Sequence, residues 1–90
     1  MYHDFPIHSF QFMQAIDTAV IKSKLQPYGQ IMSFAARGLR FIPDDPAWPP
    51  AYFNLDGTFD LATKDLYLDD VLRFVEFLRK LLGTEIEGDV

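Results

Sequence analysis

The strongest constraint on the fold is an amphipathic segment close to the C-terminus. Between Asp69 and Leu82, apolar residues recur at helical spacing within an arc of about 160°, with charged residues opposite them. Arg79 and Lys80 stand in the last turn, where the helix dipole favours cations, and Gly83 suits a left-handed stop. The pattern predicts a helix over residues 69–82 that buries one face. That face consists of Val71, Phe74, Val75, Phe77, Leu78, Leu81 and Leu82.

Leu72 departs from this pattern because it lies in the middle of the charged arc. A single exposed leucine is common on protein surfaces and needs no further explanation. The alternative is that Leu72 contacts a binding partner. The sequence supports both interpretations.

A β-hairpin is expected just before this helix, near residues 51–62. The Asp-Gly dipeptide at 56–57 suits a two-residue turn, but that register would place Phe53 opposite Asp60. A three-residue loop over 55–57, with the glycine left-handed, places Phe53 opposite Phe59 instead. The longer loop is favoured because it gathers the apolar side chains on one face. They are Ala51, Phe53, Phe59 and Leu61.

The N-terminal half is less regular. Apolar residues from Ser9 to about Leu25 recur at helical spacing and predict a helix, although Phe10 and Phe12 also alternate as in a strand. Residues 26–29 indicate a turn, and residues 30–42 fit either a short helix or a strand. We therefore expect a small single α+β domain. Its N-terminal helix completes a core in which the C-terminal helix covers the hairpin.

The negative charge is concentrated in the second half of the chain. Residues 1–45 contain four Lys/Arg and four Asp/Glu, whereas residues 46–90 contain four and nine, which accounts for the net charge of −5. An acidic surface repels nucleic-acid phosphates and steers basic partners toward it. A charge of this size also serves solubility alone. The absence of cysteine and of a long apolar run favours a cytoplasmic, non-membrane protein.

Residues 43–50 form a proline-rich segment that contains the only tryptophan, Trp48. Proline fixes the backbone and removes a hydrogen-bond donor, so a stiff loop is expected here. Trp48 can close over the core from such a loop. It can also be presented to a partner as an anchor, since tryptophan is enriched among interface hot spots.

Motifs for chemistry are incomplete. A calcium loop aligned on Gly57 would start at Tyr52 and end at Thr63, where acidic residues are required. His3 and His8 have no second cluster to complete a metal site, and no nucleophile–base pair or phosphate-binding glycine loop is present. No catalytic residue, cofactor or metal is therefore predicted. The candidate partner-binding residues are Asp44, Asp45, Trp48, Asp60, Asp65, Asp69, Leu72 and Glu76.

These observations favour a small acidic protein-binding module without catalytic activity. An inhibitor, an immunity or antitoxin-like protein, or a phage accessory protein would fit, acting on a basic protein partner. A subunit of a larger assembly and a homodimer are further options. We expect Asp60, Asp65, Asp69 and Glu76 to form one negative surface near Trp48 or Leu72.

The main alternative is a DNA-binding regulator. A helix, a turn, a second short helix at residues 30–37, a hairpin and a C-terminal helix follow an order that resembles winged-helix regulators. The basic residues near that second helix would be Lys22, Lys24, Arg37 and Arg40. The resemblance is one of element order only, because these residues contain no winged-helix motif.

Overall fold

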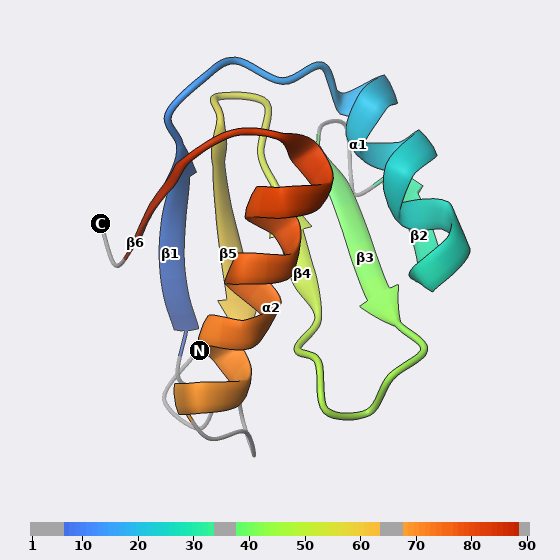
Figure 1. Ribbon diagram of the computed structural model, residues 1–90. Coiled ribbons are helices and arrows are strands. Elements are labelled where there is room, and N and C mark those ends of the chain that lie inside the picture. Colours follow the sequence, from blue (N-terminus) through green and yellow to red (C-terminus); the bar gives the residue numbers. More distant parts are fainter. Residues whose placement is uncertain (1–6, 34–37, 64–67, 89–90) are drawn as a thin grey trace.

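The computed structural model, which describes residues 7–33, 38–63 and 68–88, is an antiparallel sheet of six strands with helices on one face (Figure 1). The strand order is β2-β3-β4-β5-β1-β6. The expected α+β class, with an N-terminal and a C-terminal helix, is confirmed. The elements are β1 (Ile7–Phe12), α1 (Thr18–Leu25), the 3-10 turn η1 (Gln26–Tyr28), β2 (Gly29–Ser33), β3 (Leu39–Pro43), β4 (Ala51–Phe53), β5 (Thr58–Ala62), α2 (Leu68–Leu82) and β6 (Ile86–Gly88).

Helix α2 lies across the sheet and supplies much of the core (Figure 1). All of its buried residues belong to the predicted apolar face. Gly83, with a φ of 71°, ends the helix. Val75, Phe77 and Leu81 are partly buried at the margin of the core. Among the described residues, no helix is both long and apolar enough to cross a membrane.

The β4–β5 hairpin has the three-residue loop expected from the sequence. Phe53 pairs with Phe59, and the Asn54 N–H donates to the Thr58 carbonyl at 2.8 Å. Gly57 has a φ of 91°, the left-handed conformation that this loop requires. The buried face thus selected the register, because a slip of one residue would expose both phenylalanines.

The N-terminal helix is shorter than predicted. The expected helix from Ser9 begins only at Thr18, and its first part is β1 instead. Phe10 pairs with Phe59 in the sheet, and their ring centroids lie 5.3 Å apart. The alternation of Phe10 and Phe12 matches a strand with one buried face. Pairing with a distant strand makes this segment a strand, although its apolar residues also recur at helical spacing.

Residues 29–33 and 39–43 form β2 and β3, which settles the choice left open by the sequence. Pairs run from Gly29 opposite Pro43 to Ser33 opposite Leu39. The winged-helix order is therefore wrong at its second helix, since the first part of that segment is a strand. Arg37 lies outside the described residues.

Replacing Leu78 with alanine tests the predicted core. Leu78 is a fully buried residue of α2. The Leu78→Ala variant should therefore lose roughly 2–5 kcal/mol of unfolding free energy through transfer and cavity terms. Urea titration followed by circular dichroism measures this. A loss below about 0.5 kcal/mol, the range of ordinary surface substitutions, would contradict the burial of this side chain.

The turn geometry makes a separate prediction at Gly57. No atom lies within 4 Å of the position that a Cβ would occupy, so only the left-handed backbone opposes a side chain. Gly57→Ala should lower the unfolding free energy by about 1 kcal/mol. Gly57→Asn should lose less, because asparagine tolerates this region better. Equal stability of all three proteins would contradict the assigned turn.

Candidate protein-binding surface

Three of the predicted partner-binding residues meet on the solvent side of α2. Asp69, Leu72 and Glu76 follow one another at spacings of three and four, which places them along one stripe of the helix. Leu72 is 50% exposed, and Leu68, one turn before it, is 62% exposed. We call Leu68, Asp69, Leu72 and Glu76 the α2 outer face. Leu68 lies just outside the helix predicted from Asp69, although its spacing of four from Leu72 is visible in the sequence.

The charges on α2 are balanced rather than acidic. The helix contains three acidic and three basic residues. Arg73 donates to Asp70 at 3.2 Å, and Arg79 donates to Glu76 at 2.6 Å. Paired surface charges contribute little to the field at a distance. The acidity of the outer face is therefore local and comes mainly from Asp69.

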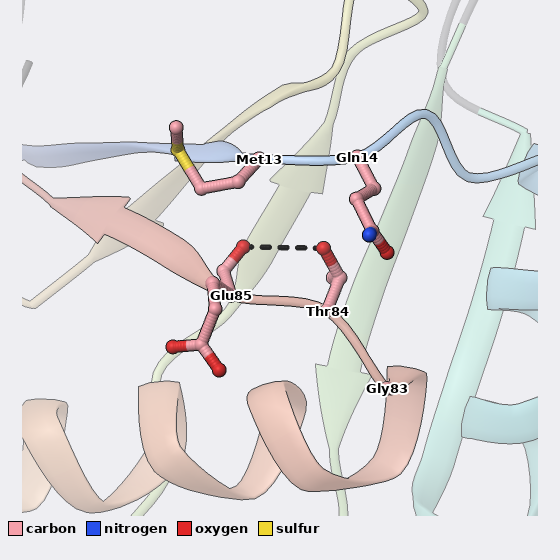
Figure 2. A pocket seen from close by; sticks show the side chains of 5 residues that line it. All are labelled: Met13, Gln14, Gly83, Thr84 and Glu85. Carbon is pink, nitrogen blue, oxygen red and sulfur yellow. Dashed lines mark hydrogen bonds between the residues drawn. The ribbon is translucent and has the colours of Figure 1, made fainter.

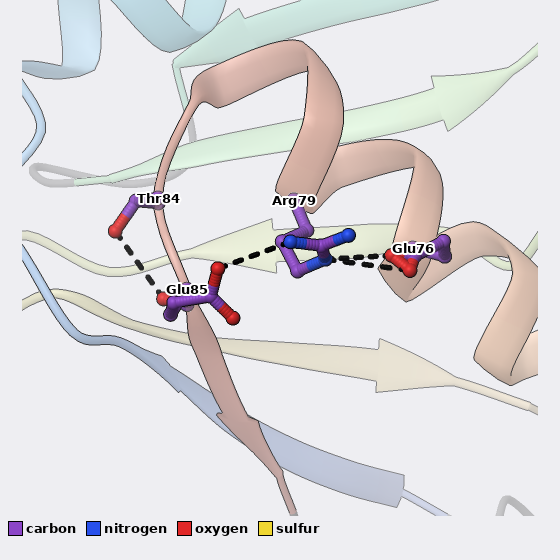
Figure 3. A network of polar contacts seen from close by, with 4 residues as sticks. All are labelled: Glu76, Arg79, Thr84 and Glu85. Atoms are coloured by element: carbon purple, nitrogen blue, oxygen red, sulfur yellow. Dashed lines mark hydrogen bonds and ion pairs between the residues drawn. The ribbon is translucent and has the colours of Figure 1, made fainter.

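Arg79 also ties the end of α2 to the segment that leads into β6 (Figure 3). Its Nε contacts the Glu76 carboxylate, while Nη1 donates to Glu85 Oε2 at 3.0 Å. The hydrogen bond from Arg79 lowers the pKa of Glu76, and the two carboxylates raise the pKa of Arg79. Arg79 therefore links Glu76 on the outer face to Glu85 through exposed ion pairs.

Trp48 packs against the opposite flank of α2 from Leu72. Its ring centroid lies 4.4 Å from that of Phe77 and 5.3 Å from that of Phe74. Tyr28 adds an edge contact to Phe77 at 5.0 Å. Trp48 is only partly buried, but these contacts give it a packing role that holds the proline-rich loop against the helix.

Asp45 organises the start of the proline-rich loop. Its Oδ1 accepts from the Ala47 N–H at 2.9 Å, and its carbonyl accepts from the Trp48 N–H at 3.1 Å. This is a turn with aspartate first and proline second, as both residue types favour. Asp44 is exposed beside it. Asp45 therefore has a local structural role that positions Trp48.

The expected single negative surface is not formed. Asp60 lies in β5 between buried Phe59 and Leu61, so it points to the face of the sheet opposite α2. There its Oδ1 accepts from Ser9 Oγ at 2.7 Å. The prediction failed because the period of two in the strand separates Asp60 from the helix. Asp65 lies outside the described residues.

A hollow of about 350 Å³ lies where the chain leaves β1 and α2 (Figure 2). Met13 and Gln14 face Thr84 and Glu85 across it. The Glu85 carbonyl accepts from the Met13 N–H at 2.9 Å and from Thr84 Oγ1 at 3.2 Å. The Glu85 carboxylate is bonded to Arg79, so the hollow holds no unpaired charged group among its lining residues.

The part of the chain that the structure describes contains no cluster of His, Cys, Asp and Glu able to hold a metal ion. Comparisons with protein-family models, with curated proteins and with solved structures give no match.

The Glu76–Arg79 pair predicts a pH-dependent difference in stability. Because the pKa of Glu76 is lowered from its ordinary value of 4.5, its contribution is present above that value and is lost as the pH falls through the folded pKa. Urea midpoints of the wild type and of Glu76→Gln should differ at pH 7 and converge as the pH falls below 4.5 and through the folded pKa of Glu76. A difference that stays constant with pH would exclude the ion pair as its cause.

Proposed function

We propose that this chain is a small protein-binding module without catalytic activity, and that the α2 outer face is its contact surface. The observation that carries the proposal is the exposure of Leu68 and Leu72 together on an otherwise charged side of a regular helix. One exposed leucine is ordinary, whereas two at a spacing of four form a continuous apolar strip. Such a strip with polar borders fits a groove on another protein.

The charged neighbours suggest how the contact is oriented. Asp69 lies beside the strip in the first turn, and Glu76 follows it one turn after Leu72. A partner with a basic rim would be steered by the negative net charge of −5 and held by the leucines. An inhibitor, an immunity or antitoxin-like protein, or a phage accessory protein would use a surface of this kind.

In this proposal Trp48 supports the helix and is not itself the anchor presented to a partner. Its stacking on Phe74 and Phe77 fixes the flank of α2 and leaves the outer face free for a partner. Trp48 then supports the presentation of the leucines. The binding energy itself would come from Leu68 and Leu72, since hot-spot energy concentrates in central apolar residues.

Affinity capture from the native host tests this proposal with matched baits. Leu72→Ala should lose the dominant captured protein, with a fall in affinity of about 1 kcal/mol or more. Leu55→Ala is the control, because Leu55 is also exposed, at 64%, but lies in the β4–β5 loop. Both variants should keep the wild-type melting temperature.

Two results would contradict the proposal. Equal capture by Leu72→Ala and wild type would remove the α2 outer face from the contact. Enrichment of DNA at physiological salt would favour the regulator, since non-specific DNA contacts are weak there. With the partner purified, rising salt should mainly slow association, as expected for charge steering.

A further inference from the structure

The β2 edge of the sheet has features of a second docking site, separate from the α2 outer face. β2 is at one end of the strand order, and its only strand neighbour among the described residues is β3. α1 packs over β2 on the helix-covered side (Figure 1). Among the described residues, no strand pairs with the outer edge of β2, and an end strand of this kind can pair with another extended chain.

The alternation of hydrogen bonds between β2 and β3 identifies which backbone groups of β2 point away from β3. The Asp44 N–H donates to the Tyr28 carbonyl at 3.0 Å, which marks that pair as hydrogen-bonded. In an antiparallel ladder such pairs alternate, so Gln30 and Met32 bond to β3. The N–H and C=O groups that point outward belong to Gly29, Ile31 and Ser33.

β2 lacks the usual protection of an edge strand. Its five residues include no charge and no proline, whereas charged residues and proline normally block edge pairing. β6, at the other end of the sheet, has Glu87 at its centre and Glu85 just before it. The two edges therefore differ, and only the β2 edge is uncharged.

The surroundings of β2 are basic although the protein is acidic. The described residues of α1, β2 and β3 include Lys22, Lys24 and Arg40 and no Asp or Glu, and Asp44 lies just beyond β3, opposite Tyr28. Lys22 is exposed on α1, and Arg40 lies in β3 opposite Met32. An extended segment entering here would meet positive charge from both sides of the sheet.

Arg40 supplies a specific contact for such a segment. It lies on the sheet face opposite α2, and its buried Nε has no hydrogen-bond partner within the described part of the chain. A residue paired with Met32 on an added strand would stand two strands away from Arg40, about 10 Å. The guanidinium and a glutamate side chain together span this distance, so a carboxylate there would pair with the positive charge of Arg40.

We propose that the β2 edge binds an extended acidic segment of a partner protein as a seventh strand. The outward groups of Ile31 and Ser33 would form the main-chain bonds, and Arg40 would select for carboxylate side chains. A second copy joined through β2 is disfavoured because it would bring two basic surfaces together. A second copy joined through its acidic β6 offers only three paired residues.

Amide hydrogen exchange with a defined probe tests this proposal. The probe is a capped octapeptide of alternating glutamate and valine, and the comparison peptides replace glutamate by glutamine or lysine. Addition of the acidic peptide should slow exchange at Ile31 and Ser33, while Gln30 and Met32, which already bond to β3, should change little. Affinity should fall from the glutamate to the glutamine to the lysine peptide.

Matched variants separate the charge contact from the strand pairing. Arg40→Gln should weaken peptide binding roughly two- to fivefold, whereas Arg73→Gln, which removes the same charge on exposed α2, should have no effect. Ser33→Pro removes one outward N–H without breaking the ladder to β3 and should reduce binding strongly. Leu72→Ala should bind the peptide normally, so failure of this proposal and failure of the α2 proposal are distinguishable.

Several outcomes would overturn the proposal. Unchanged exchange at Ile31 and Ser33, or equal binding of the lysine peptide, would exclude an acidic added strand. Protection that rises with protein concentration alone, together with changes in β6, would identify a second copy as the occupant. A DNA duplex that shifts Lys22 and Arg40 without protecting Ile31 would assign the basic side to nucleic acid.

Discussion

The packing of α2 across the sheet is the interaction on which the rest of the structure depends. Phe74 and Leu78 are fully buried, and Phe74 stacks on Phe41 with centroids 6.3 Å apart. In a chain of 90 residues the core is modest, so aromatic side chains must supply much of the buried area. The same contact fixes Phe77 and, through it, Trp48. The proline-rich loop is thus ordered by the helix.

Covering only one face of the sheet has consequences for function. The strand period of two sends Arg40 and Asp60 to the opposite face, where no described helix covers them. The end strands also keep unpaired backbone groups. A six-stranded sheet with one helical layer therefore presents a helix surface and an uncharged edge to solvent. These are two modes of protein recognition that use different physics, one apolar and one based on main-chain hydrogen bonds.

The elements that could be predicted from the sequence are those determined locally. The C-terminal helix shows an uninterrupted period of 3.6, and the hairpin register follows from placing Phe53 and Phe59 on one face. β1 could not be predicted as securely, because Phe10 is buried by pairing with a strand almost 50 residues later in the chain. The position of Leu72 on the charged side of the helix predicts its exposure, which the structure shows, whereas a contact with a partner stays a prediction. The grouping of Asp60 with Glu76 was wrong, although the predicted hairpin pairing already placed Asp60 opposite to its apolar neighbours.

The net charge of −5 conceals two regions of opposite sign. Residues 18–43 carry a charge of +4, so the rest of the chain carries −9. Dividing the chain at its midpoint hid this contrast, because Asp17, Asp44 and Asp45 offset the basic residues between them. Among the described residues, division by structural elements places basic residues without acidic ones on α1 and β3, whereas the acidic residues lie on the loops, β5, α2 and β6. Under the two proposals, a partner would meet a different field at each end of the sheet, and the sign of its own charge would select the end at which it docks.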